Sequence, residues 1–323
     1  MSLIVQKFGG SSVADAEKIL HAAHIAKEAY CAGNDVLVVV SAQGDTTDDL
    51  TAKARELTQE PPARELDALL ATGEQCSAAL FAMALQSMGV PAVSLSGWQL
   101  PLRTDGRHGD ARIEGVGHER IDRELAAKRV VVVTGFQGVN DAWDVTTLGR
   151  GGSDYSAVAL AAALGAARCL IYTDVDGVYT ADTRICPTAS RLARVSYADM
   201  YALARAGAQV LHDKCVALAE ERGVEPEVRS CAAGSAGTRV GPKDEGRGVT
   251  GVTRRDASSG DLAAVTLVGP ALPSLALEKR AIAALDTAEI AARGVDAGER
   301  TLTLYVDRER SREAVCAIHD AVI

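Results

Sequence analysis

Aromatic side chains and clustered basic residues are scarce in this chain of 323 residues. Phe, Trp and Tyr together make up 4% of the sequence, and the formal net charge is −9. An acidic chain without a basic cluster is poorly suited to bind nucleic acid or an anionic membrane, so we expect neither as a partner. We also find no apolar run long enough to span a bilayer and no secretory signal pattern, and we therefore expect a cytoplasmic protein.

The seven cysteines are scattered along the chain, and no two of them form a Cys-x-x-Cys pair. This spacing argues against a zinc site and against a disulfide framework. Most of the cysteines lie among apolar residues, where a thiol acts as a small core side chain. We therefore expect no metal site made by protein side chains, and the cysteine usage fits a reducing cytoplasm.

Apolar residues make up 47% of the sequence, which is enough for a substantial core, and the length suggests about two domains. In the first two thirds, short apolar runs alternate with helical patterns. Near-continuous apolar strands separated by helices are typical of an α/β fold with a mainly parallel sheet covered on both faces. Ligand sites in such sheets form at the carboxyl ends of the strands. The predicted strands are residues 4–8, 36–40, 92–95, 130–134 and 169–173, and the predicted helices include residues 63–88 and 155–164.

The most informative motif is the glycine-rich segment 146–154, which stands just before an apolar helical pattern. Its glycines let backbone N–H groups approach an anion at the helix N-terminus. Arg150 can bind a carboxylate or phosphate through two N–H groups, and Asp154 supplies an acceptor in the same loop. The alternative is a tight turn in which Ser153 or Asp154 only caps the helix.

A second glycine turn follows the first predicted strand. Lys7 ends that strand, and Gly9, Gly10 and Ser11 come directly after it. This order matches neither the Walker A loop nor the Gly-x-Gly-x-x-Gly dinucleotide motif. The pattern indicates a phosphate-binding loop of a different kinase architecture, in which Lys7 places a charge on the transferred phosphate. A solvated lysine at a strand end is the alternative, but it would not explain two glycines.

A third motif, residues 173–184, follows the predicted strand 169–173 and contains Asp-x-Asp-Gly. It lacks the remaining acidic positions of an EF-hand, so we exclude a calcium loop. In this order and spacing the three motifs resemble the amino acid kinase family, and specifically its aspartokinases. The segments 41–50, 72–75, 135–138 and 207–212 strengthen the resemblance, which covers residues 2–240.

The resemblance implies a three-layer αβα sandwich, ATP as phosphoryl donor and Mg²⁺ held mainly by phosphates and water. An aspartate substrate needs a two-pronged donor for its α-carboxylate, for which Arg150 is best placed, and an anion for its ammonium, for which Glu74 is the candidate. Its side-chain carboxylate is already ionised at neutral pH, so the attack needs no general base. The implied catalytic residues are Lys7 and Asp154; the substrate residues are Ser41, Thr47, Glu74, Phe136, Arg150 and Ser153; and the ATP residues are Lys7, Gly9, Gly10, Ser11, Thr173, Asp174, Tyr179, Asp182 and Arg184.

The last quarter of the chain resembles a single ACT-like α+β module, whereas aspartokinases usually carry two. We place the catalytic domain at residues 1–240, a linker at 241–248 and the module at 249–323, and we expect a homodimer through the module. A dimerisation module without a ligand is the alternative for this tail. The predicted order β-α-β-β-α comprises residues 262–268, 275–285, 288–292, 301–306 and 310–322.

The function that the resemblance implies is ATP-dependent phosphorylation of L-aspartate, the first step towards lysine, threonine and methionine. Two alternatives remain open: a paralogue that phosphorylates another carboxylate substrate, and a non-catalytic regulatory subunit. The first is suggested by the segment 100–103, where Arg103 could favour a different anionic substrate. The intact set of Lys7, Glu74, Arg150 and Asp154 argues against the second.

Overall fold

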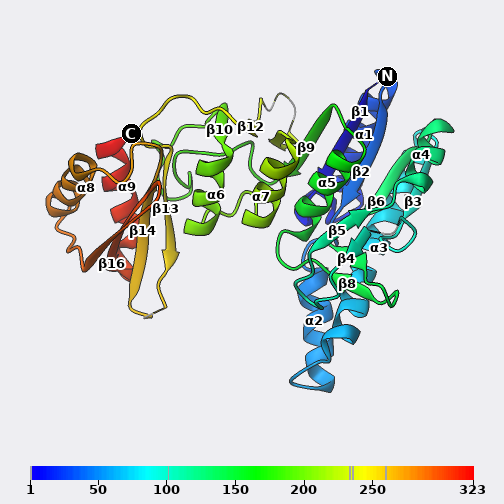
Figure 1. Cartoon of the computed structure of the whole chain (residues 1–323), viewed down its shortest axis with the longest axis horizontal. Helices are drawn as coiled ribbons and strands as arrows, with labels where there is room; N and C mark the ends of the chain where they lie inside the picture. The colour runs from blue at the N-terminus through cyan, green and yellow to red at the C-terminus, as the bar shows by residue number, and fades with distance from the viewer. Residues whose placement is uncertain (1, 101, 233, 235, 259) are drawn as a thin grey trace. The chain divides into compact units, whose positions relative to one another are not determined.

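The computed structural model describes every residue except 1, 101, 233, 235 and 259. It contains two compact units, which are described separately. The first comprises Met1–Asp176 and Leu218–Ser235, and the second comprises Gly177–Ala217 and Ala236–Ile323. The chain therefore passes from one unit to the other three times (Figure 1). The domain boundaries proposed from the sequence remain a prediction.

The first unit is built on parallel strands in the order β11-β9-β1-β2-β6-β3. All five strands predicted for this part of the chain are present. β1 is central, with β2 on one side and β9 on the other, so that Lys7 lies opposite Val39 and Ile171. The six strands are β1 Leu3–Phe8, β2 Asp35–Val40, β3 Ala92–Leu95, β6 Val130–Thr134, β9 Arg168–Thr173 and β11 Pro226–Ser230.

Alternate residues of these strands point to opposite faces of the sheet, and helices bury both faces. One face packs against α1 Ala16–Cys31 and α3 Ala63–Ser87, whose side chains join Phe8 and Val38 in one apolar core. The other face packs against α5 Gly152–Ala163, which contacts β1, β2 and β9. Figure 1 shows this αβα layering, which confirms the predicted fold class. Two further helices, α2 Thr46–Leu57 and α4 Glu119–Ala126, complete the unit's α-helices together with part of α7 Asp213–Arg222.

α3 is long and apolar enough, by length and composition, to cross a membrane. The expectation that no such run exists was therefore too strict. A core helix passes the same test, so the finding is weak evidence for a membrane span. In this unit α3 packs on α1, α2, β3 and β6, and it carries two buried acidic side chains, Asp67 and Glu74.

A second, four-stranded sheet in the first unit was not predicted. Its order is β5-β4-β7-β8, in which β4 and β7 are parallel and the two outer pairs are antiparallel. The strands are three or four residues long, too short for a clear period-two pattern. They are β4 Leu102–Thr104, β5 Ile113–Val116, β7 Gln137–Val139 and β8 Val145–Thr147.

The second unit contains an antiparallel sheet in the order β13-β14-β16-β15, with α8 Leu275–Thr287 and α9 Ser311–Val322. The two helices pack on each other, and α9 packs on β13, β14 and β16. Their shared core includes Val265, Leu304 and Ile318. The strands are β13 Gly251–Asp256, β14 Leu262–Val268, β15 Gly294–Gly298 and β16 Thr301–Asp307. The same unit holds the parallel pair β10 Arg194–Ser196 and β12 Thr238–Gly241, and α6 Tyr197–Ala206.

One element predicted for this module is wrong. Residues 288–292 form no strand; they follow the end of α8 in a turn in which Glu289 has a φ of 55°. A left-handed residue breaks strand geometry, so β-pairing begins only at Gly294. β13 was also missed, and it adds a strand ahead of the predicted β-α-β-β-α order.

Candidate active site

An ion pair between Lys7 and Asp154 lies at the carboxyl edge of the parallel sheet. Along β1, Phe8 points to the α1 and α3 face, where its ring stacks on Tyr172 with 4.8 Å between centroids. Its neighbour Lys7 therefore points to the opposite face, where α5 begins. Lys7 Nζ lies 2.7 Å from Asp154 Oδ1, and the two side chains are 9% and 11% exposed. The structure thus joins two sequence motifs that are almost 150 residues apart.

The glycine turn after β1 is held between its neighbours. The Gly9 N–H donates to the Tyr172 carbonyl at 3.1 Å, and the Gly44 N–H donates to the Gly10 carbonyl at 3.1 Å. A Cβ on Gly10 would lie 2.7 Å from the Ala42 carbonyl oxygen, so only glycine fits there. This close contact locks the turn, whose exposed side includes Ser11, to the end of β2.

Glu74 is a buried carboxyl group with one oxygen unused. Its side chain comes from the middle of α3, and the residue is 2% exposed. The Ala42 N–H donates to Oε1 at 2.9 Å, whereas Oε2 is buried and has no hydrogen-bond partner. Burial raises the pKa of Glu74 to about 8, despite the opposing effect of the Ala42 N–H. A cationic group that reached Oε2 would supply the missing interaction.

The loop 149–151 carries Arg150 to the surface beside the start of α5. Gly149 and Gly151 have φ angles of 76° and 70°, which favour glycine at both positions. Arg150 between them is exposed, and within the described part of the chain its guanidinium has no hydrogen-bond or ion-pair partner. Next along the helix, Ser153 is buried against Gly135, where a Cβ would lie 2.7 Å from the Ser153 Cβ. The anion-binding prediction for this loop is therefore compatible with its geometry.

Asp67 is a buried residue that binds the backbone segments next to this loop. The sequence analysis did not identify it as a candidate. It is 1% exposed and accepts the Thr147 hydroxyl at 2.6 Å and the Gly109 N–H at 3.0 Å. His108 lies 2.8 Å from its Oδ2. A Cβ on Gly149 would lie 2.7 Å from Asp110 Oδ1, so the segment held by Asp67 packs directly against the arginine loop. An acidic residue inside the apolar run 66–71 was the available signal.

The remaining candidates of the first unit lie at or just after the ends of strands or, for Thr47, in a helix. Ser41 follows β2 and donates its N–H to the Phe8 carbonyl at 3.1 Å. Phe136 follows β6 with a φ of 67°, and its N–H donates to Ser156 Oγ at 3.2 Å. Thr47 is half-buried in the first turn of α2, and Thr173 at the end of β9 donates its hydroxyl to Asp174 at 3.0 Å. Their predicted roles remain predictions.

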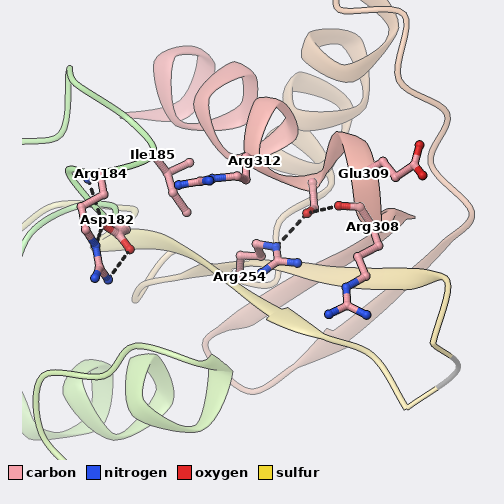
Figure 2. A pocket seen from close by; sticks show the side chains of 8 residues that line it. Asp182, Arg184, Ile185, Arg254, Arg308, Glu309 and Arg312 are labelled. Atoms are coloured by element: carbon pink, nitrogen blue, oxygen red, sulfur yellow. Dashed lines mark hydrogen bonds and ion pairs between the residues drawn. The ribbon is translucent and has the colours of Figure 1, made fainter.

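Three predicted nucleotide residues, Tyr179, Asp182 and Arg184, belong to the second unit. Arg184 donates Nε and Nη2 to the two carboxylate oxygens of Asp182 at 3.0 and 2.8 Å, and this pairing lowers the pKa of Asp182. The pair lines a hollow of about 540 Å³ rich in arginine (Figure 2). Arg254 is held there by Ser311 at 2.7 Å. The lining residues are Asp182, Arg184, Ile185, Arg254, Arg308, Glu309, Ser311 and Arg312.

Arg103, which the sequence analysis considered as an extra cation for the substrate, lies on the surface of the first unit. Arg103 is exposed on β4, and its Nη1 lies 3.2 Å from Asp141 Oδ1. Pro101 of the same segment lies outside the described residues. Arg103 is therefore paired at the surface.

Comparison with known proteins places these features in a family. Residues 2–230 match the model of the amino acid kinase family. Over 240 residues the chain is 51% identical to the aspartokinase of Geobacillus stearothermophilus, which covers 74% of this chain and 59% of that protein. It is 49% identical over 294 residues to the aspartokinase of Mycobacterium bovis, covering 88% and 69%. The chain belongs to the amino acid kinase family, and it spans about three fifths of the length of the first of these relatives.

Solved structures agree with this assignment. The E. coli aspartokinase III in complex with aspartate and ADP superposes with a TM-score of 0.88 over 99% of both chains at 23% identity, which supports the fold. The aspartate kinase of Synechocystis superposes with a TM-score of 0.69 at 29% identity, over 99% of this chain and 69% of the other. Within this family, the chain is therefore similar to aspartokinases in both sequence and fold.

Replacing either member of the Lys7–Asp154 pair should destabilise the protein, because the other charge stays buried without a partner. We expect Lys7→Met and Asp154→Asn each to lower the free energy of unfolding by about 3–5 kcal/mol. The double variant removes both charges and should lose clearly less than the sum of the two. Urea unfolding of the wild type, the two single variants and the double variant measures the coupling energy between the two residues. Strictly additive losses of unfolding free energy would contradict a buried pair.

Glu74 should make stability depend on pH. Its pKa rises from an ordinary value of 4.5 to about 8 on folding, so from about pH 5 to about pH 8 the unfolded chain is ionised while the folded one keeps its proton. The free energy of unfolding should therefore fall across this range, and ionisation of the folded protein limits the loss above it. The Glu74→Gln variant cannot ionise at this position. Subtracting its pH profile from that of the wild-type protein therefore removes the contributions of all other groups. Parallel pH profiles of the two proteins would refute the shifted pKa.

Proposed function

We infer that the protein transfers the γ-phosphoryl group of ATP to the side-chain carboxylate of L-aspartate, giving ADP and 4-phospho-L-aspartate. The observation that carries this proposal is the buried Lys7–Asp154 pair at the carboxyl edge of a parallel sheet, bordered by a locked glycine turn. The chain's similarity to aspartokinases of about 50% identity over 240 residues supports the choice of substrate.

We propose that the substrate is selected by two side-chain groups that have no hydrogen-bond partner within the described residues. An α-amino acid presents an ammonium and a carboxylate on one carbon. The unused Oε2 of Glu74 suits the ammonium, because ion pairing offsets the burial of its charge. The guanidinium of Arg150 suits the α-carboxylate, because its planar fork donates two parallel hydrogen bonds. Ser41, Thr47, Phe136 and Ser153 are proposed to position the substrate between these two groups.

The chemical step requires positioning and charge neutralisation more than covalent help from the protein. A side-chain oxygen of aspartate forms a bond to the γ-phosphorus while the bond from the γ-phosphorus to the β,γ-bridging oxygen breaks, and that oxygen leaves with ADP. Lys7 neutralises charge on the transferred group, and the N–H groups of Gly9, Gly10 and Ser11 donate to phosphate oxygens. Asp154 keeps the Lys7 ammonium in place. No proton is moved, because the attacking carboxylate is already ionised.

Mg²⁺ supplies charge neutralisation at the β- and γ-phosphates when it is bound with the nucleotide. Among the described residues of the first unit, no three His, Cys, Asp or Glu side chains converge as a metal cage, and Asp154 is already paired with Lys7. This donor set fits an ion carried mainly by phosphate oxygens and water. Thr173 and Asp174 at the end of β9 remain the proposed nucleotide contacts of this unit.

The cellular setting is proposed on the same basis. All seven cysteines are free thiols, which suits the reducing cytoplasm. Phosphoaspartate production would serve lysine, threonine and methionine synthesis. We also propose a homodimer through the C-terminal module. The outer strands of its sheet are β13 and β15, since β14 and β16 each have a partner strand on both sides.

Activity assays with a substrate series test this proposal. Acyl-phosphate capture by hydroxylamine should show turnover with L-aspartate and ATP, and much less with succinate, which lacks the ammonium, or β-alanine, which lacks the α-carboxylate. Glu74→Gln should reduce the preference for aspartate over succinate. Absence of product from aspartate, with turnover of another carboxylic acid, would overturn the assignment.

Arg150 should act on the amino acid and leave ATP binding unaffected. Lysine keeps the charge but cannot reproduce the forked hydrogen bonds, so Arg150→Lys should raise KM for aspartate about tenfold or more and leave KM for ATP nearly unchanged. Because the residue is exposed, the variant should fold normally. Steady-state kinetics with each substrate varied separately provides the measurement. An equal rise in both constants would show that the loop binds the nucleotide.

A further inference from the structure

A cluster of metal-ligating side chains lies in the second unit, apart from the residues assigned to phosphoryl transfer. Ligand atoms of Cys186, His319 and Asp320 all lie within 4.8 Å of one another. Cys186 and His319 are buried, whereas the Asp320 side chain is 55% exposed, so the cluster is open to solvent on one side. We propose that these three side chains bind one Zn²⁺ ion through Cys186 Sγ, His319 Nδ1 and an Asp320 carboxylate oxygen.

The cluster joins two segments that are distant in sequence. The first, residues 178–192, is closed by backbone hydrogen bonds between Thr180 and Ser190 at 2.9 Å and between Leu192 and Val178 at 2.8 Å. Cys186 lies in this segment. The second is the last turns of α9, where His319 and Asp320 follow Cys316 by three and four residues and so share one helix face.

A single hydroxyl occupies the centre of the cluster. Thr188 Oγ1 lies 3.1 Å from Cys186 Sγ, 3.4 Å from His319 Nδ1 and 2.5 Å from Asp320 Oδ1. The three atoms thus already surround one small polar group. Replacement of that group by an ion requires rotation of the exposed Thr188 side chain and contraction of the three distances to the 2.0–2.3 Å that is typical of zinc ligands.

The histidine has the outer contact that metal-binding histidines use. Its Nε2 lies 2.9 Å from the Thr180 hydroxyl, which also accepts the Ser190 N–H at 3.0 Å. With Nδ1 on the metal, Nε2 keeps its proton and donates it to Thr180. Such a contact fixes both the tautomer and the orientation of the ring.

The donor chemistry selects the ion. One thiolate, one imidazole and one carboxylate suit Zn²⁺ better than Mg²⁺ or Ca²⁺, which prefer oxygen ligands alone. Thiolate and carboxylate together balance the charge of the ion. Cys316 lies beside the site, where its thiol donates to the Ile185 carbonyl at 2.9 Å. Because this thiol is already hydrogen-bonded to the Ile185 carbonyl, Cys316 lies outside the ligand set, and water fills the fourth position.

Occupancy of the site would tie the segment 178–192 to α9. The same segment carries Asp182 and Arg184, which line the arginine-rich hollow with residues around the start of α9 (Figure 2). A bound ion would hold this hollow in one arrangement. The site therefore couples metal occupancy to the C-terminal module, and its three ligands are not among the residues proposed for phosphoryl transfer.

Cobalt titration of the reduced, chelator-treated full chain tests the proposal. One equivalent of Co²⁺ should produce a sulfur-to-cobalt charge-transfer band, which Zn²⁺ should abolish by displacement. Cys186→Ser should lose the band, and Cys231→Ser, a half-buried cysteine of the first unit, should keep it as the matched control. Saturation without the band, its survival in Cys186→Ser, or no saturable binding would each overturn the proposal.

A second variant keeps the test decisive if Cys186→Ser does not fold. Asp320→Asn changes an exposed side chain and should weaken Zn²⁺ binding at least tenfold, measured by competition with a chromophoric chelator. Zn²⁺ should also raise the thermal midpoint of the wild-type protein and of Cys231→Ser, and raise it less in Asp320→Asn at the same concentration. Equal affinity and equal shifts in all three proteins would exclude Asp320 from the site and overturn the ligand set.

Discussion

The structure of the first unit depends on one constraint: two opposite charges must meet away from water at the end of a central strand. A buried ammonium or carboxylate alone is costly, so β1 and α5 have to keep Lys7 and Asp154 in contact. That requirement determines which face of the sheet Lys7 uses and where α5 begins. It also explains why Phe8 can turn to the opposite face and join the apolar core there. Strand alternation links the charge pair and the core in adjacent residues.

Glu74 lies at the same edge of the sheet and, unlike Lys7 and Asp154, has no ionic partner among the described residues. It is as deeply buried as the ion pair, but one of its oxygens has no partner. A protein that only had to be stable would not keep such a group, whereas a protein that binds a cation gains affinity from it. The glycine turn after β1 and the loop 149–151 border the Lys7–Asp154 pair and Glu74 with closely packed backbone. The Arg150 side chain, between two left-handed glycines, is exposed at the edge of this backbone.

The sequence was sufficient to predict the features that repeat locally, and less so those that depend on distant partners. The apolar runs of β1, β2, β6 and β9 are long enough to show their type, and the glycine turns mark the strand ends. The four short strands of the second sheet have no such pattern, because distant pairing and not local periodicity defines them. Asp67 was missed for the same reason: its role lies in hydrogen bonds to residues 42 and 80 positions away. Residues 288–292 were assigned a strand that begins only at Gly294, because a left-handed turn intervenes.

The three passages of the chain between its units have a consequence for how the protein can be divided. Because the second unit takes residues 177–217 from the middle of the sequence, no single cut yields two fragments that each hold a whole unit. A fragment that ends after the last strand of the first unit retains Cys186 and Thr180 but loses the helix that packs beside them. Nascent chains face the same situation on the ribosome, where the segment 178–192 must wait for more than 100 further residues before α9 exists. Gene fusions and truncations that treat the C-terminal module as a detachable tag would therefore leave part of its core behind.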